Sequence, residues 1–426
     1  MKRGLLTATL ALSIFTGSAQ TITDTVSVGS PSGSGINYPN QVWYSLPNDM
    51  LGYRERNEWD IAFDMKSITS GVMINSAGGV MLWKYPKGNL SGGWAMIDTF
   101  GMSASWTPRY NSDTAWALSA IGRYADPGNP NNLDWGTYNS TTHTVNGDSL
   151  YIIKLANGQY KKFAIESLIG GVFTFKYANL DGTSAQTQTL SKVAYPGKNF
   201  AYFNLATNTA QDREPLAENW DLLFTQYTTF LPAPYGVTGV LLNRGVKAVK
   251  VSGLPDVATN TNYSGQTFSS QINTIGYNWK SFNGSAYVIK DSQLYFVKRV
   301  NGDIWKLVFT GFGGAATGDF MFSKEKLYSA PTGIASMHES SVSLTVYPNP
   351  SAGRIVHVIY DLESPAQNAR LSVHDISGRM VAFTALPEAT MGLHQYQLPT
   401  ESLKPGAYLI SLEAGSERAQ QMLIIQ

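Results

Sequence analysis

The sequence predicts an all-β protein, and three observations support this prediction. Aromatic residues make up 12% of the 426 residues and there are 40 glycines, a usage typical of strands joined by tight turns. Asn-Gly pairs at 157–158 and 301–302 each separate two strand-like arms, which indicates β-hairpins. The sequence has no cysteine, so packing and hydrogen bonds must hold the chain together without disulfides or thiolate metal sites.

The N-terminus has the features of an export signal. Lys2 and Arg3 precede an apolar run over residues 5–15, and the small residues at 17–19 suit a cleavage site. The run is too short to span a bilayer, and no later stretch approaches about 18 uninterrupted apolar residues. We therefore expect residues 1–19 to be a signal peptide and the mature chain to have no transmembrane segment.

Internal repetition organises most of the remaining chain. Five segments recur later in the chain in the same order: 42–46 as 201–205, 59–63 as 220–224, 71–75 as 239–243, 151–165 as 295–309 and 170–171 as 313–314. The Asn-Gly pair of each hairpin accepts the positive φ angles of a type I′ turn. We expect a duplicated antiparallel β-module, with one copy at 21–197 and the other at 198–330.

Asp60 and Asp221 each follow a tryptophan at the start of a predicted strand. Because the pair recurs in both copies, we expect these carboxylates to accept backbone N–H groups and not to act as general acids.

A third unit follows a polar linker at 331–341. From Val342 onwards, short alternating runs separated by Pro, Gly and Asn predict an immunoglobulin-like β-sandwich. Residues 347–350 (Tyr-Pro-Asn-Pro), 373–379 (Val-His-Asp-Ile-Ser-Gly-Arg) and 403–408 (Leu-Lys-Pro-Gly-Ala-Tyr) form three ordered motifs. On these motifs, residues 342–426 resemble the sorting domain of the type IX secretion system. The resemblance implies contact with that secretion machinery and delivery out of a Bacteroidetes-type cell, to the medium or the outer-membrane surface.

The duplicated module resembles the HmuY family of haem-binding surface proteins. The similarity lies in the Trp-Asp runs at 59 and 220, the aromatic strand before each of them, and the two Asn-Gly hairpins. It covers about residues 40–327 and implies haem, or a related tetrapyrrole, as the ligand. Residues 21–330 contain one histidine, His143, so iron cannot be held between two histidines of one chain, as it is in the founding member of the family.

The first copy carries the candidate ligand site. Gly71 and Trp135 are 64 positions apart, whereas the matching Gly239 and Trp279 are 40 apart, so the first copy has an insertion. The insertion contributes rings and thioethers suited to a flat apolar ligand: Trp94, Met96, Met102 and Trp106. A larger local core or a covering flap is the alternative interpretation.

His143 is the candidate axial ligand of haem iron, and Tyr287 occupies the equivalent position of the second copy. Imidazole, phenolate and thioether groups all serve as axial ligands, so a methionine is a candidate for the second position. The alternative is that His143 is a surface residue of a strand.

Composition and missing motifs narrow the function. The net charge is +1 and charged residues make up 14% of the chain, which argues against a nucleic-acid partner. The sequence has no nucleophile elbow, phosphate-binding loop, His-Glu-x-x-His or dinucleotide motif, which argues against an enzyme. We expect an exported, non-enzymatic haem-binding protein. The alternative is a structural or adhesive surface protein that contacts glycans or other proteins.

Deleting residues 342–426 is expected to leave residues 21–330 folded but retained in the periplasm, because separate cores are expected on either side of the linker. Cell fractionation with the full chain as control measures the routing. Normal surface delivery of the truncated chain would contradict the sorting function of the third unit.

Overall fold

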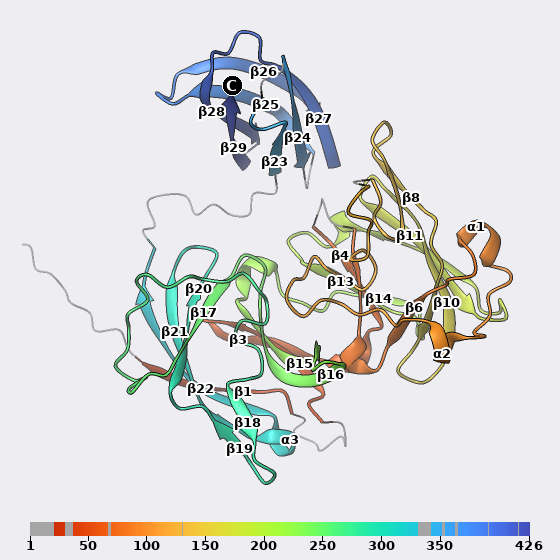
Figure 1. Cartoon of the computed structure of the whole chain (residues 1–426), viewed down its shortest axis with the longest axis vertical. Helices are drawn as coiled ribbons and strands as arrows, with labels where there is room; N and C mark the ends of the chain where they lie inside the picture. Colours follow the sequence, from red (N-terminus) through yellow and green to blue (C-terminus); the bar gives the residue numbers. More distant parts are fainter. Residues whose placement is uncertain are drawn as a thin grey trace, which may run out of the picture.

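The computed structural model describes residues 21–29, 37–66, 70–129, 131–330, 342–351, 354–362, 365–390, 392–415 and 417–426. The expected signal peptide (1–19) and linker (331–341) lie outside the described residues. The all-β prediction is confirmed, because the described chain consists mainly of antiparallel strands (Figure 1). The helices are single turns: α1 (Leu90–Gly93), α2 (Met102–Ser105), α3 (Gly314–Thr317), and the 3-10 turns η1 (Arg56–Glu58), η2 (Ser76–Gly78), η3 (Lys192–Ala194) and η4 (Ala217–Asn219).

Residues 59–211 form a first lobe made of an inner and an outer sheet. The first inner sheet has the order β14 (Thr209–Gln211), β13 (Phe200–Asn204), β4 (Ile61–Asp64), β5 (Val72–Ile74). The first outer sheet contains β12 (Gln186–Ser191), β11 (Val172–Asn179), β10 (Tyr160–Ile169), β8 (Thr144–Gly147) and β7 (Gly136–Asn139), with β9 (Tyr151–Lys154) joining β10 to β6 (Met81–Lys84).

A second lobe combines the two ends of the 21–330 segment. The second inner sheet has the order β16 (Pro234–Leu242), β15 (Leu222–Phe230), β2 (Asn40–Ser45), β3 (Asp49–Glu55). The second outer sheet has the order β1 (Ile22–Ser27), β22 (Asp319–Tyr328), β21 (Ile304–Phe312), β20 (Gln293–Lys298), β17 (Lys247–Ser252). A separate hairpin is formed by β18 (Lys280–Phe282) and β19 (Tyr287–Ile289).

The two lobes do not follow the order of the two sequence copies. The β2–β3 hairpin of the first copy pairs with β15 of the second copy, and the β13–β14 hairpin of the second copy pairs with β4 of the first. The predicted boundary at 197/198 remains a prediction about the duplication, but the packed cores divide the chain differently. One core draws on residues 61–205, and the other combines residues 26–46 with 222–322.

The central strands of the inner sheets, β2, β4, β13 and β15, bury both of their faces. On β15, Leu222 and Phe224 enter the core of the second lobe, whereas Leu223 and Tyr227 join a different buried cluster. On β13, Phe203 enters the core of the first lobe while Tyr202 points to the opposite face. Because side chains alternate along a strand, the second set lies between the two inner sheets and holds the lobes together.

Asp60 and Asp221 have the fold role expected from the sequence. Asp60 Oδ2 accepts a hydrogen bond from the backbone N–H of Leu205 at 2.7 Å, and Asp221 Oδ2 accepts one from the N–H of Leu46 at 2.8 Å. Each carboxylate therefore fixes the hairpin that the other copy supplies. The Nε–H of Arg299 also donates to both carboxylate oxygens of Asp221, each at 2.9 Å, in a mostly buried ion pair.

The two Asn-Gly hairpins are confirmed, but their type I′ turns are not. Gly158 and Gly302 have φ of 87° and 91°, whereas neither asparagine has a positive φ. In the first hairpin, the N–H of Gly158 donates to the carbonyl of Leu155 at 2.9 Å. The same bond recurs from Gly302 to Arg299, so both hairpins close on a four-residue turn in which the glycine takes the left-handed position.

Residues 342–426 form a two-sheet sandwich around a core of their own, as predicted (blue in Figure 1). One sheet has the order β23 (Val342–Tyr347), β24 (Ile355–Leu362), β27 (Gly392–Pro399). The other has the order β26 (Met380–Ala389), β25 (Ala366–Asp375), β28 (Gly406–Ala414), β29 (Glu417–Ile425). Among the residues that the structure describes, the helices lack the length and apolar character needed to cross a lipid bilayer.

Replacing Asp221 by Ala is expected to lower the free energy of unfolding by about 3 kcal/mol or more, because the N–H of Leu46 loses its acceptor and the mostly buried Arg299 guanidinium keeps only the more distant Asp303 carboxylate, at 3.8 Å. Replacing the equivalent Asp60, which has no arginine partner in the described residues, is expected to cost about 1–3 kcal/mol. Denaturant titration of both variants measures the difference. Equal losses would contradict the importance of the Arg299 pair.

Candidate functional site

A cavity of about 80 Å³ lies between the two inner sheets. Its walls combine side chains from β2, β5, β13, β15 and β16 with a segment of the first-copy insertion. The aromatic members of the lining are Trp43, Trp59, Trp116, Phe200, Tyr202, Trp220 and Tyr227. Small-molecule sites often lie at the junction of two packed units, and this cavity is smaller than the roughly 300–1,000 Å³ of pockets for drug-sized ligands.

The insertion of the first copy closes one side of this cavity. Asn111 exchanges hydrogen bonds of 2.7 and 3.1 Å with Ile74, which places the segment beside β5. From there, the indole N–H of Trp116 donates to the carbonyl of Leu242 at 2.8 Å, and Thr229 of the second lobe donates to Asp113 at 2.5 Å. The insertion therefore connects the lobes as well as lining the cavity.

Three buried polar atoms of the lining have no hydrogen-bond partner among the described residues. They are Nε1 of Trp43, Nε1 of Trp220 and the hydroxyl of Tyr227, on side chains that are 1%, 3% and 8% exposed. Leaving a buried donor unpaired costs about 1–3 kcal/mol. Such groups are a signature of a site that exchanges hydrogen bonds with a ligand or with ordered water.

Glu214 is a fully buried carboxyl group in the same lining. The backbone N–H groups of Asn199 and Phe200 and the hydroxyl of Tyr202 donate to it, the last two at 2.9 and 3.2 Å. Burial raises the pKa of Glu214 from its ordinary value of 4.5 to about 7, although these hydrogen bonds oppose the rise. The cavity therefore contains a carboxyl group that changes charge near neutral pH.

The structure brings three of the predicted ligand-site residues together. Trp94, Met102 and Trp106 pack against a buried cluster that includes Ile152 and Ala164, on the face of the first outer sheet that points away from the lobe core. Met96 lies in the same insertion, but its side chain is 74% exposed. These residues form a local packing cluster and do not line the cavity between the inner sheets.

The predicted iron ligands lie in separate places. His143 is exposed in the turn between β7 and β8, where its Nδ1 is 2.8 Å from the hydroxyl of Tyr138. Tyr287 lies on β19 of the second lobe, where its ring packs against Phe312 at 4.9 Å. The two hairpins differ in register. Tyr138 and Phe282 are equivalent in the repeat, but Tyr138 pairs with Val145 whereas Phe282 pairs with Tyr287.

Trp43, Trp116 and Trp220 were not predicted as site residues. Trp116 belongs to the same insertion as Trp94 and Trp106, and nothing in the local sequence separates the tryptophan that reaches the second lobe from the two that stay on the first. A usable signal was present in the repeat: the position of Gln41 in the first copy is Phe200 in the second. The two strands match in sequence on either side of the comparison, but one has a polar residue where the other has an aromatic one, so the copies have diverged at this position.

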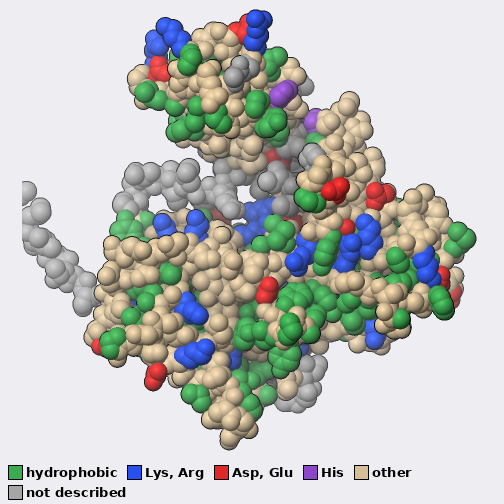
Figure 2. All heavy atoms as spheres, viewed as in Figure 1, with side chains coloured by type: hydrophobic (Ala, Val, Ile, Leu, Met, Phe, Trp, Pro, Cys, Tyr) green, Lys and Arg blue, Asp and Glu red, His purple; other side chains and the backbone are tan. Residues whose placement is uncertain are grey.

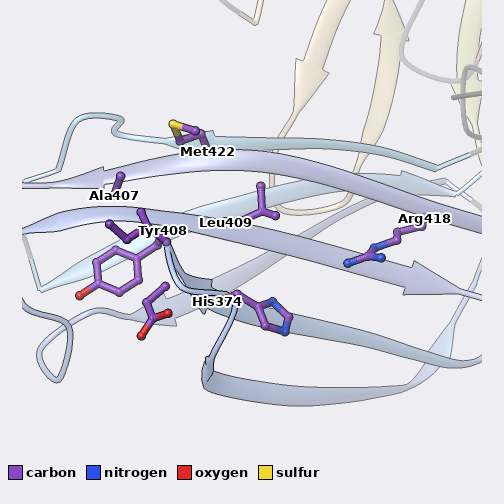
Figure 3. Close-up of a pocket in the computed structure, with 9 residues that line it drawn as sticks. His374, Ala407, Tyr408, Leu409, Arg418 and Met422 are labelled. Atoms are coloured by element: carbon purple, nitrogen blue, oxygen red, sulfur yellow. The ribbon is translucent and has the colours of Figure 1, made fainter. Parts of the chain in front are cut away.

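The sorting unit carries a second hollow, of about 500 Å³. Figure 3 shows His374, Tyr408, Leu409, Arg418 and Met422 contributed by the neighbouring strands β25, β28 and β29. Two of the motifs that identified this unit meet here, because Asp375 pairs with Tyr408 across the sheet. Mixed apolar and charged side chains make this hollow a candidate contact surface.

The same motifs also have clear fold roles. Asn349 donates to the carbonyl of Met422 at 2.6 Å and accepts from the N–H of Ile424 at 2.9 Å, which attaches the last strand to the start of the unit. Asp375 accepts hydrogen bonds from Ser377 and Arg379 and shapes the turn between β25 and β26. These bonds lower the pKa of Asp375 to about 2, with the Ser377 hydroxyl as the largest cause.

Within the described parts of the chain, no group of three or more His, Asp or Glu side chains comes close enough together to hold a metal ion. The proposed ligation of iron by His143 and the candidate haem contacts of Trp94, Met96, Met102, Trp106 and Tyr287 remain predictions. What the cavity offers chemically is hydrogen-bond donation, ring contact and the two carboxyl groups of Asp113 and Glu214.

Glu214→Gln is expected to remove a pH dependence of stability. The folded state keeps a proton on Glu214 that the unfolded chain loses above its ordinary pKa, so the free energy of unfolding falls as pH rises from about 5 to 7, by up to about 3 kcal/mol. Denaturant titration at several pH values measures this slope, with the exposed Glu55→Gln as control. An unchanged slope in Glu214→Gln would contradict the assignment.

Comparison with known proteins gives a family for the tail alone. A family model described as a secretion system C-terminal sorting domain matches residues 345–426. No curated protein matches the chain.

Three solved structures show distant likeness. PorZ, an essential surface component of the type IX secretion system of Porphyromonas gingivalis, is 10% identical over 75% of this chain and 50% of its own, with a TM-score of 0.16. A polysaccharide lyase is 9% identical over 92% of this chain and 47% of its own, with a TM-score of 0.20. Dimeric latent PorU from Porphyromonas gingivalis is 10% identical over 91% of this chain and 33% of its own, with a TM-score of 0.17.

The chain spans half or less of the length of each of these structures. At these TM-scores the likenesses carry no weight for fold or function, and none of them supports an HmuY-like module. The match to the tail agrees with its sandwich fold and its three motifs. The C-terminal unit is therefore a type IX secretion sorting domain, and the protein that carries it is secreted or displayed at the outer-membrane surface.

Proposed function

We propose that the protein is an exported, non-enzymatic binding protein that holds a small ligand between its two inner sheets. The sorting domain contacts the type IX secretion machinery, and residues 21–330 are the cargo that meets the ligand outside the cell. The observation that carries the proposal is the set of three buried, unpartnered donors, on Trp43, Trp220 and Tyr227, around one cavity at the junction of the lobes.

The size of the cavity limits the ligand. A volume of about 80 Å³ holds several water molecules or a ligand of a few non-hydrogen atoms, since a cavity that admits benzene measures about 150 Å³. A tetrapyrrole is several rings wide, so haem does not fit between the inner sheets as they are packed here. Haem binding, which the family resemblance implies, stays a prediction for a different surface, with Trp94 and Trp106 as its best-placed rings.

A second candidate function is adhesion. Phe100 and Met96 of the insertion are 84% and 74% exposed, and Tyr53 and Tyr235 on the second inner sheet are 54% and 62% exposed. Figure 2 shows hydrophobic side chains gathered on the visible face where the two lobes meet. Exposed apolar groups of this kind favour contact with a partner surface.

A cavity-filling substitution tests the proposed function. In a thermal-shift assay on the secreted protein with small alcohols, amides, carboxylic acids, sugars and haem, at least one compound of a few non-hydrogen atoms is expected to raise the melting temperature of the wild type. The gain should disappear in Met73→Trp, because Met73 lines the cavity and the larger ring occupies the ligand volume. Met50→Trp, on the exposed edge strand β3, is the matched control and should retain the gain.

Overpacking alone costs about 1–3 kcal/mol, so Thr228→Trp at the half-buried rim provides a second blocking variant. Equal shifts in the wild type and both blocked variants would place the ligand elsewhere. No shift with any compound would reject the cavity as a binding site and favour the adhesive function.

A further inference from the structure

We propose that a hollow on the first lobe binds the carboxylate group of a small organic anion, with Arg109 and Lys84 as its partners. The hollow measures about 500 Å³, and its lining shares no residue with the cavity between the inner sheets. The inference therefore concerns a second site and does not depend on the proposed function. We call this site the Arg109 hollow, and its lining includes Lys84, Tyr85, Pro86, Pro108, Arg109 and Tyr124.

Two segments of the first copy meet at the Arg109 hollow. Lys84 is the last residue of β6, whereas Arg109 belongs to the insertion. The backbone N–H of Arg109 donates to the carbonyl of Leu82 at 2.8 Å, and the two residues form an isolated β-bridge. This pairing fixes the insertion beside β6 and brings two cationic side chains to one hollow.

The guanidinium group of Arg109 is held in place on one side only. Its Nη1 donates to both carboxylate oxygens of Asp134, at 2.6 and 2.7 Å, and the side chain of Asp134 is 1% exposed. The guanidinium carbon lies 4.5 Å from the ring centre of Tyr124 and 5.9 Å from that of Tyr151. Nε and Nη2 of Arg109 have no hydrogen-bond partner among the described residues. Two free N–H groups on a fixed guanidinium form a fork that matches a planar carboxylate.

The backbone of Asp134 indicates that this arrangement is imposed on the chain. Asp134 is buried and has a φ of 70°, in the left-handed region that is uncommon for residues other than glycine. The equivalent residue of the second copy is Asn278, which does not have a positive φ. The second copy also lacks the insertion that supplies Arg109. Strained residues of this kind persist where the surroundings fix them, and they cluster at functional sites.

The charges of the Arg109 hollow favour a singly charged anion. Lys84 and Arg109 line it, whereas Asp and Glu are absent from the described lining. Behind the lining, Asp134 offsets one of the two positive charges, because it is paired with Arg109 and lies 3.5 Å from Nζ of Lys84. Asp98 is nearby but is paired with Lys87. One positive charge therefore remains for the ligand, and a carboxylate balances it.

The other lining residues favour an anion that has an apolar part. Tyr85, Pro86, Pro108 and Tyr124 contribute rings to the hollow. Its volume of about 500 Å³ is far larger than a carboxylate group needs and falls within the roughly 300–1,000 Å³ of small-molecule pockets. An inorganic anion would use the cations but leave these apolar groups without a contact.

Isothermal titration of the secreted full chain with benzoate tests this inference. Benzoate is expected to bind, because it joins one carboxylate to one apolar ring. Benzyl alcohol has the ring without the charge, and acetate has the charge without the ring, so each should bind about 10-fold more weakly or less. Equal binding of benzoate and benzyl alcohol would contradict recognition of the carboxylate.

Substitution of the cations tests which groups hold the carboxylate. Arg109→Lys should weaken benzoate binding about 10-fold, because lysine keeps the charge but cannot form the fork. Lys84→Gln should weaken it about 2- to 5-fold, as expected for a partly exposed charge. Lys87→Gln is the matched control, since it removes the same charge from a neighbouring side chain outside the lining. Melting temperatures show whether each variant is folded, and if Arg109→Lys is not, Lys84→Gln decides.

Substitution of the exposed ring tests the apolar part. Tyr124→Ala should weaken benzoate binding but leave the weak binding of acetate unchanged, because it removes apolar contact and no charge. The matched control is Tyr328→Ala at the end of β22, because Tyr328 and Tyr124 are similarly exposed, at 40% and 45%. Equal benzoate affinity in the wild type, Tyr124→Ala and Lys84→Gln would place the anion outside the Arg109 hollow.

Failure of this inference can be told apart from failure of the proposed function. Met73→Trp fills the cavity between the inner sheets and should leave benzoate binding unchanged. Loss of benzoate binding in Met73→Trp would place the carboxylate in that cavity, which would overturn the inference and support the proposed function. Absence of benzoate binding to the wild type would overturn the inference and leave the proposed function as it stands.

Discussion

The two-sided burial of the inner strands is the constraint on which the rest of the cargo structure depends. A strand that places Leu222 in a lobe core and Leu223 between the lobes needs a packed layer on each side. On one side, each inner sheet packs against the outer sheet of its own lobe. On the other side, the two inner sheets pack against each other. The cavity and the position of Trp116 follow from this arrangement, because both lie in the layer between the lobes.

Duplication accounts for the approximate symmetry of this layer, and divergence leaves it with an unpaired donor. Equivalent residues such as Asp60 and Asp221 keep the same hydrogen bonds in both copies, because each is needed to fix a hairpin. The Gln41 and Phe200 positions tolerate divergence, because they face the space between the lobes and not a lobe core. The second copy has an apolar residue, Phe200, where the first has Gln41, and the indole N–H of Trp220 beside it remains unpaired.

Local features were predictable from the sequence, whereas pairing across the copies was not. The hairpins at Asn157 and Asn301 and the sandwich after Val342 depend on neighbouring residues, so short patterns identify them. The β2–β3 and β13–β14 hairpins are equivalent in sequence, so similarity cannot show which copy each one joins. The same limit affected the site: Trp94 and Trp116 belong to one insertion, and only the packed lobes show that Trp116 alone reaches the second lobe.

The exchanged hairpins have an evolutionary meaning. A single copy of the repeat would contain the inner hairpin of one lobe and the outer strands of the other, so it could complete neither core. Two separate copies could exchange hairpins and form a twofold-symmetric dimer, whose stability would depend on protein concentration. Joining them on one chain removes that dependence, which benefits a protein that is diluted once it leaves the cell. It also lets equivalent positions of the two copies accept different residues, as at Gln41 and Phe200.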